Sequence, residues 1–261
     1  MGPTLNYETI FWETGHHYIA GVDEVGRGCL AGPVVAGAVI LPVHDRVICN
    51  VLRAAGLRDS KKLSARQREG LVPLIEEIAL AYAIGVASSA EIDQHGIVPA
   101  CRLAMGRALR GLSIQPTGLL VDGPTNGSFF SLNQKLMSDP QILQPSVGNL
   151  GNNSTLSQAF DQTPQKGASL WAKSTQRNVI RGDSACLSIA AAAVIAKVHR
   201  DTLMVQSDRL YPGYAFGSHK GYGTAAHRAA LRRLGATPIH RMTWKPLREL
   251  SIVQMELKME D

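Results

Sequence analysis

Apolar residues in the first half of the chain gather in short runs that end at glycine or at an acid. Such runs are typical of β-strands, and we predict strands over 18–23, 33–41, 80–88 and 117–123. A loop containing Gly26 and Gly28 joins the first two, which predicts a β-hairpin. Elsewhere apolar residues recur at helical spacing and predict helices over 64–79, 98–109, 184–210, 224–235 and 246–257. This alternation, with no internal repeat and no second hydrophobic core, predicts a single α/β domain over 1–261.

One long segment departs from both patterns. Residues 124–176 are rich in Ser, Asn, Gln, Gly and Pro and contain few periodic apolar positions. A stretch of this length without periodicity is unusual inside a compact domain. We therefore expect a mobile surface insertion over about 124–176, with order resuming near Asn178. From about residue 199 onward, the pattern predicts a helical C-terminal portion.

Composition narrows the class of protein. The chain has 261 residues, of which 45% are hydrophobic and 18% charged, so wholesale disorder is excluded. Its formal net charge of +6 is compatible with a polyanionic partner and equally with an ordinary solvated surface. No apolar run approaches the roughly 20 residues of a membrane helix, no signal pattern is present, and the four cysteines form no CxxC pair. We expect a cytoplasmic protein with no membrane association and no cysteine metal site.

Four acids fall at positions where catalytic carboxylates could meet. Asp23 and Asp122 each close an apolar strand, Glu24 follows Asp23, and Asp183 precedes an alanine-rich helix. Carboxylates brought to one edge of a sheet repel one another unless a divalent cation neutralises them, and oxygen ligands favour Mg²⁺ or Mn²⁺ over zinc. Such a site suits in-line phosphoryl displacement. Taken singly, Glu24 is better explained as a solvated turn residue and Asp183 as a helix cap, and Asp122 is equally well explained as a turn former; these explanations weaken only if the four acids meet.

Two glycine-containing loops carry further candidates. Gly26, Arg27 and Gly28 allow close backbone approach to a ligand, or simply form a hairpin turn. The segment 219–224 places Lys220 and Tyr222 in a flexible loop that could hold a phosphate and stack on a sugar or base. An ordinary loop with a half-buried tyrosine is the alternative.

Several blocks of the chain together resemble one known family, ribonuclease HII. They are 21–28 (GVDEVGRG) with 30–35 (LAGPVV), 59–63 (DSKKL), 121–123 (VDG), 182–183 (GD) with 188–192 (SIAAA) and 196–198 (AKV), and 219–224 (HKGYGT). They occur in the family's order and cover most of the chain from Tyr18 to about Pro246. The joint match is specific, whereas any single block is not.

The resemblance implies a fold and an activity. The fold is ribonuclease H-like, with a central mixed five-stranded sheet flanked by helices and a helical C-terminal portion. The activity is endonucleolytic hydrolysis of the RNA strand of RNA–DNA hybrids, and incision of DNA duplexes 5′ of embedded ribonucleotides, leaving a 3′-hydroxyl and a 5′-phosphate. These substrates are the implied partners, the implied roles are replication and repair, and we expect a monomer.

The resemblance also implies roles for particular residues. The carboxylates that catalyse the reaction and bind Mn²⁺ or Mg²⁺ match Asp23, Glu24, Asp122 and Asp183. The loop that senses the ribose 2′-hydroxyl matches Gly26, Arg27 and Gly28. Tyr222 matches the tyrosine that packs on the deoxyribose beyond the RNA–DNA junction, and Lys61 and Lys220 are assigned to substrate binding.

Two departures from the family pattern and three alternatives remain. Cys29 stands where proline is expected, and the interval between Asp122 and Asp183 is much longer than in the family.

A nucleic-acid-binding module with a degenerate site would need to have lost an acid, but all four are present. Ribonuclease HIII carries an additional N-terminal domain, whereas only about 17 residues precede the first predicted strand here. A junction resolvase or integrase would not explain the loops at 26–28 and 220–223.

Overall fold

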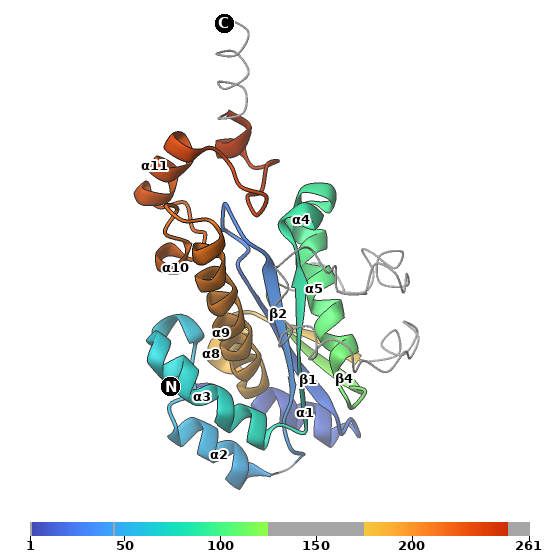
Figure 1. The fold of residues 1–261 in the computed structure, drawn as a ribbon. Helices are drawn as coiled ribbons and strands as arrows, with labels where there is room; N and C mark the ends of the chain where they lie inside the picture. Colours follow the sequence, from blue (N-terminus) through green and yellow to red (C-terminus); the bar gives the residue numbers. More distant parts are fainter. Residues whose placement is uncertain (1, 44, 125–174, 250–261) are drawn as a thin grey trace, which may run out of the picture.

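A mixed five-stranded sheet forms the centre of the protein (Figure 1). The computed structural model describes residues 2–43, 45–124 and 175–249. The strand order is β3-β2-β1-β4-β5. The strands are β1 (Ile19–Val25), β2 (Val34–Ile40), β3 (Ala81–Ala87), β4 (Gly118–Asp122) and β5 (Thr175–Val179). The implied mixed five-stranded sheet is therefore confirmed.

The pairing of β1 decides where the acids lie. β1 pairs with β2 as the antiparallel hairpin that the sequence predicts, and β2 pairs antiparallel with β3. On its other side β1 runs parallel to β4, with Val22 opposite Val121. Asp23 and Asp122 are the next residues after Val22 and Val121. Because parallel strands end at the same edge of a sheet, these two acids lie side by side at that edge.

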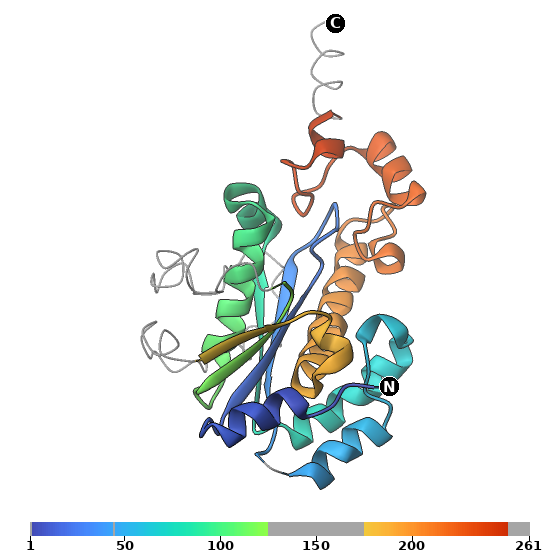
Figure 2. The same ribbon diagram turned by 180° about the vertical axis from the view of Figure 1, so that it is seen from behind.

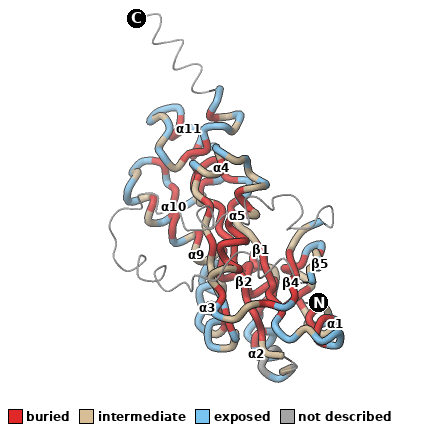
Figure 3. Tube along the Cα trace, turned by 90° about the vertical axis from the view of Figure 1, so that its right-hand side faces the viewer, coloured by how far each residue is buried: buried red, intermediate tan, exposed pale blue. Residues whose placement is uncertain are grey.

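Helices cover both faces of the sheet (Figures 1 and 2). One face packs against α5 (Ile97–Gly111), which follows the short α4 (Ser89–His95). The other packs against α9 (Leu187–Leu210) and α3 (Ala65–Ile78), and α3 continues through Pro73 as one helix. Burial is concentrated in the strands and in the sides of α5 and α9 that face them (Figure 3).

Small residues let α9 lie very close to the sheet. An added Cβ at Gly21 of β1 would lie 2.3 Å from the backbone carbon of Ser188, and one at Gly37 would lie 2.4 Å from the Ala192 oxygen. The alanines over 190–193 of α9 are buried against the same surface. Only glycine on the strands and alanine on the helix permit this spacing.

The N-terminal part contains helices that the sequence pattern did not predict. α1 (Asn6–Glu13) precedes the first predicted strand, buries Phe11 and Trp12, and lies against β4 (Figure 2). α2 (Arg46–Ala54) and the short 3₁₀ helix η1 (Ser60–Lys62) follow β2. α1 and α2 have only 8 and 9 residues, and tertiary packing rather than periodicity stabilises helices this short.

Two predicted boundaries are wrong. The helix predicted over 184–210 is divided at Cys186 into α8 (Gly182–Ala185) and α9. The division arises because the N-terminal segment intervenes: Thr4 N donates to the Ala185 oxygen, and Leu187 N donates to the Thr4 oxygen. β5 begins at Thr175, so the last two residues of the predicted insertion belong to the sheet. Pro124 is also described, and the rest of the insertion, 125–174, lies outside the described residues.

Beyond the sheet the chain continues as helices, as predicted. The β1–β2 hairpin points toward α10 (Phe216–His219), which occupies part of the predicted loop, and α11 (Ala225–Leu234) (Figure 1). Residues 245–249 are helical, and the remainder of the predicted final helix lies outside the described residues. None of the helices in the described ranges has the length and apolar character needed to cross a membrane.

Candidate functional site

The four predicted acids come together at the end of the central strands. Asp23 and Glu24 lie near the end of β1, and Asp122 is the last residue of the neighbouring β4. Asp183 lies in α8, after Arg181 adopts a left-handed conformation with φ 55°. Gly182 N donates to Asp122 Oδ1 at 2.6 Å and so joins α8 to the end of β4.

Asp183 is not the helix cap that its sequence position permits. Arg181 occupies the N-cap position without a side-chain cap, and Asp183 lies in the first turn of α8. Its carboxylate is buried, and Oδ2 lies 3.5 Å from the ammonium of Lys61. The side chain is thus directed to the edge of the sheet where the other acids lie.

Burial and mutual repulsion both act on the carboxylates of the cluster. Burial raises the pKa of Asp23 well above its usual value, and repulsion from Asp122, Glu24 and Asp183 raises it further. Burial and the charge of Asp122 raise the pKa of Glu24 to about 7. Burial also raises the pKa of Asp122, with Asp183 adding to the effect. Negative charge accumulates here without enough positive charge to balance it.

Lys61 forms an ion pair with Asp183. Although burial acts to lower the pKa of Lys61, the carboxylates of Asp183 and Asp23 raise it above the ordinary value. Asp59 fixes the turn that carries Lys61, since its Oδ1 accepts from Lys61 N at 3.0 Å. Asp59 Oδ2 also lies 3.5 Å from Ser184 Oγ of α8. Asp59 was not among the predicted site residues, although its place before a short helix is a recognisable capping signal.

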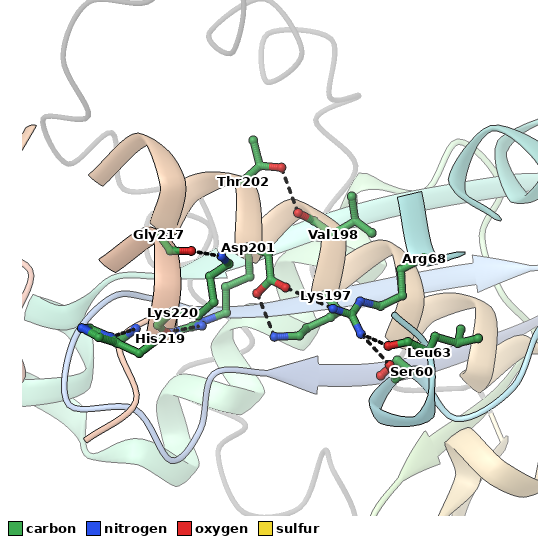
Figure 4. A network of polar contacts seen from close by, with 12 residues as sticks. Ser60, Leu63, Arg68, Lys197, Val198, Asp201, Thr202, Gly217, His219 and Lys220 are labelled. Carbon is green, nitrogen blue, oxygen red and sulfur yellow. Dashed lines mark hydrogen bonds and ion pairs between the residues drawn. The ribbon is translucent and has the colours of Figure 1, made fainter. Parts of the chain in front are cut away.

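A network of charges anchors the Lys61 segment to α9 (Figure 4). Arg68 of α3 donates to the backbone oxygens of Ser60 and Leu63 at 2.9 and 2.6 Å. Its guanidinium also lies 3.5 Å from Asp201, which accepts from Lys197 Nζ at 2.8 Å. Lys61 therefore projects from a turn that is fixed at both ends.

The glycine loop of the hairpin lies next to the carboxylates. Gly26 has φ +93°, a conformation that favours glycine, and Cys29, in the place of the expected proline, closes the turn by donating to the Gly26 oxygen. The exposed guanidinium of Arg27 lies 3.8 Å from Glu24. This ion pair links the loop to the acids.

The second loop packs against the first. Leu30 N and Ala31 N donate to the Gly221 oxygen at 2.8 and 3.3 Å, and an added Cβ at Gly221 would lie 2.2 Å from the Ala31 oxygen. Tyr222 keeps 43% of its surface exposed. The ammonium of Lys220 donates to the Gly217 oxygen (Figure 4). All ten predicted site residues thus lie in two connected groups, the acids with Lys61 and the two loops.

The chemistry of the carboxylates fits Mg²⁺ or Mn²⁺. In the part of the chain that the structure describes, no three side chains of His, Cys, Asp or Glu are arranged as ligands of one ion. Magnesium, however, is usually bound by one or two carboxylates together with waters and substrate phosphates. The oxygen-only donors and the uncompensated negative charge at Asp23, Glu24 and Asp122 match that requirement.

Together, the sheet order, the flanking helices and the acids at the ends of the central strands define a ribonuclease H-like protein. The family model described as Ribonuclease HII matches residues 20–145 and 155–247, and the gap between these ranges falls inside the predicted insertion. The chain belongs to the ribonuclease HII family. It is a type HII ribonuclease H, an endonuclease that cleaves RNA in RNA–DNA hybrids.

Individual relatives agree with this assignment. Ribonuclease HII of Synechococcus elongatus is 43% identical over 244 residues, which cover 93% of each chain. That of Roseiflexus castenholzii is 41% identical over 249 residues, covering 95% of this chain and 91% of the relative. The crystal structure of ribonuclease H2 from Pyrococcus horikoshii has a TM-score of 0.64 and 26% identity, covering 92% of this chain and 99% of that one. A Bst-RNase HIII in complex with Mn²⁺ shares the fold, with a TM-score of 0.58 and 20% identity, over 92% of this chain and 71% of that one.

Proposed function

We propose that this enzyme incises DNA duplexes on the 5′ side of an embedded ribonucleotide, in addition to cleaving RNA–DNA hybrids, and that it requires a divalent cation. The observation that carries the proposal is the contact between two groups of residues. The Arg27–Glu24 ion pair joins the 26–28 loop to the carboxylate cluster. Backbone hydrogen bonds to the Gly221 oxygen join the same hairpin to the segment that carries Tyr222. In this proposal the residues assigned to cleavage and those assigned to ribose recognition are neighbours, which supports reading of the ribose beside the cleaved bond.

In this proposal Asp23, Glu24, Asp122 and Asp183 hold Mg²⁺ or Mn²⁺. The cation supplies an activated water and stabilises the leaving oxygen when bound. The presence of Mn²⁺ in the Bst-RNase HIII complex is consistent with this choice of ion. The water oxygen bonds to phosphorus as the bond from phosphorus to the 3′ oxygen breaks. The products are a 3′-hydroxyl and a 5′-phosphate.

The chain's own residues would position the duplex. Gly28, where an added Cβ would meet open space, would allow the ribose to approach the backbone of the 26–28 loop, and a contact to the 2′-hydroxyl is what distinguishes RNA from DNA. The half-exposed ring of Tyr222 would pack on the deoxyribose beyond the junction. Lys61, which is largely exposed, and Lys220, which uses one of its three donors on Gly217, would contact phosphates.

An incision assay tests the proposal. The substrates are a DNA duplex with one ribonucleotide, a uniform RNA–DNA hybrid and an all-DNA duplex, each with Mg²⁺, with Mn²⁺ and with chelator. We expect metal-dependent incision 5′ of the single ribonucleotide, cleavage of the hybrid and no cleavage of DNA. Cleavage of the hybrid alone would contradict the junction specificity. Binding without any cleavage would favour a module with a degenerate site.

Removal of misincorporated ribonucleotides and of RNA primers is the cellular role that this activity supports. Both are RNA covalently joined to DNA, and both present the junction that the two loops would read. A strain lacking the enzyme should accumulate alkali-sensitive ribonucleotides in its DNA. Normal levels in that strain would argue against the repair role.

A further inference from the structure

Two arginines of the C-terminal half are completely buried behind the two loops. Arg200 of α9 and Arg241 each have 0% exposure. Within the described residues neither guanidinium forms an ion pair with a carboxylate; each donates instead to backbone oxygens. Because a guanidinium is expensive to bury, such a placement calls for a strong set of hydrogen bonds.

Arg241 binds the 26–28 loop from the inside. Its Nη2 donates to the Gly26 oxygen at 2.6 Å and its Nη1 to the Arg27 oxygen at 2.9 Å. Nε and Nη2 both donate to the Gly32 oxygen, at 3.1 and 2.9 Å. The guanidinium also lies over the ring of Trp244, 5.1 Å from its centroid. One side chain thus fixes both ends of the hairpin loop.

Arg200 connects that loop to the loop of Tyr222. Its Nε donates to the Pro33 oxygen at 2.9 Å and its Nη2 to the Ala31 oxygen at 3.3 Å. Its Nη1 donates to the Lys220 oxygen at 2.9 Å. An added Cβ at Gly26 would lie 2.1 Å from Arg200 Nε, so the guanidinium packs directly against this glycine.

Arg241 remains charged at neutral pH. Burial lowers the pKa of Arg241 to about 10, which still lies far above 7. Charge-assisted hydrogen bonds are about twice as strong as neutral ones, and the planar guanidinium directs several of them at fixed angles. The carbonyl groups of Gly26 and Arg27 are consequently held toward the interior of the protein.

We propose that Arg200 and Arg241 are positioning residues that set the 26–28 loop and Tyr222 at a fixed separation, and thereby determine selectivity for the RNA–DNA junction. This inference rests on the proposed junction specificity. A single-ribonucleotide duplex engages the ribose contact and the deoxyribose contact together. A uniform hybrid offers no deoxyribose to Tyr222 and depends less on the separation of the two loops.

The test compares Arg200→Lys and Arg241→Lys with the wild type. Lysine keeps the charge and loses the planar set of donors. For each protein, kcat and KM are measured on the single-ribonucleotide duplex and on the uniform hybrid. Since misplacement by about 1 Å can reduce a rate by about 100-fold, we expect kcat/KM on the junction substrate to fall about 10-fold or more. The value on the hybrid should fall much less, so the ratio of the two values decreases.

Arg107→Lys is the matched control. Arg107 is a buried arginine of α5 that donates to the Val86 oxygen at 2.6 Å and to Glu91 at 2.7 Å, on the face of the sheet opposite α9. This variant should lose thermal stability and keep the wild-type ratio. An equal fall on both substrates in the Arg200 and Arg241 variants, or an unchanged ratio, would overturn the proposal.

The substrate preference of the wild type distinguishes a failure of the positioning role from a failure of the proposed function. If the wild type fails to prefer the junction, the proposed function is wrong; if it prefers the junction and the lysine variants do so equally, the positioning role is wrong. Should neither variant fold, the guanidinium Nε–H resonances of wild-type Arg200 and Arg241 provide the measurement. With chelator present to prevent cleavage, we expect them to shift on addition of the junction duplex and not of all-DNA duplex. Identical spectra with both duplexes would overturn the proposal.

Discussion

Replacing Glu24 by glutamine removes one charge from the carboxylate cluster and keeps the size of the side chain. In the folded, metal-free protein, burial and then repulsion from Asp122 raise the pKa of Glu24 from 4.5 to about 7. A group whose pKa is raised by folding binds more protons in the folded state, so the folded state loses stability as the pH rises between these two values. At about 1.4 kcal/mol per pKa unit, the loss is about 3 kcal/mol above pH 7 and about 1 kcal/mol at pH 5.

Urea unfolding in chelator at pH 5 and pH 8 measures this effect. The free energy of unfolding of Glu24→Gln, relative to the wild type, should increase by about 2 kcal/mol between the two pH values. Glu77→Gln, at an exposed position of α3, serves as the control and should show no comparable change. Saturating Mn²⁺ should stabilise the wild type more than Glu24→Gln, because the ion binds the charged carboxylates. A stability difference that is the same at both pH values would refute the reasoning about buried like charges.

Three further predictions follow from the contacts. Asp183→Asn should lower cleavage about 10³-fold, since metal-assisted charge stabilisation contributes several kcal/mol, and should leave duplex binding in a gel-shift assay largely intact; undiminished turnover would remove Asp183 from the site. Tyr222→Ala should reduce the preference for the junction about 10-fold, the scale of a lost aromatic contact, and equal losses on both substrates would contradict its role. Gly21→Ala should lower the free energy of unfolding by about 1–3 kcal/mol, because the new Cβ would lie 2.3 Å from Ser188; a variant with the wild-type melting temperature would show that α9 can shift away from β1.

Much of the architecture could be predicted because strong local signals coincide with it. β1 begins with an apolar run, β2 is a continuous one, and a glycine loop joins them. α3 begins with the capping box of Ser64 and Gln67. The convergence of the four acids could be expected since Asp23 lies near the end of β1, Asp122 ends β4, and these two strands run parallel. The order of family blocks along the chain supplied the rest of the assignment.

The predicted elements are wrong where tertiary contacts outweigh the local sequence pattern. The break at Cys186 depends on Thr4, more than 180 positions away, whose backbone pairs with Ala185 and Leu187. β5 has the polar sequence TQRNV and forms only because β4 offers it an edge. The positions of Arg200 and Arg241 behind the loops carry no local signal, because a buried and an exposed arginine on a helix or loop look alike in sequence.

Incision at a single ribonucleotide should depend on a divalent cation held by the carboxylates. The rate is measured against Mn²⁺ concentration for the wild type, Asp23→Asn and Asp122→Asn, with Arg107→Lys as a folded control. We expect a rate that rises to saturation with Mn²⁺ in the wild type and the control, and no detectable incision by either carboxylate variant. Incision by the wild type in excess chelator, or at an undiminished rate by both carboxylate variants, would contradict this expectation.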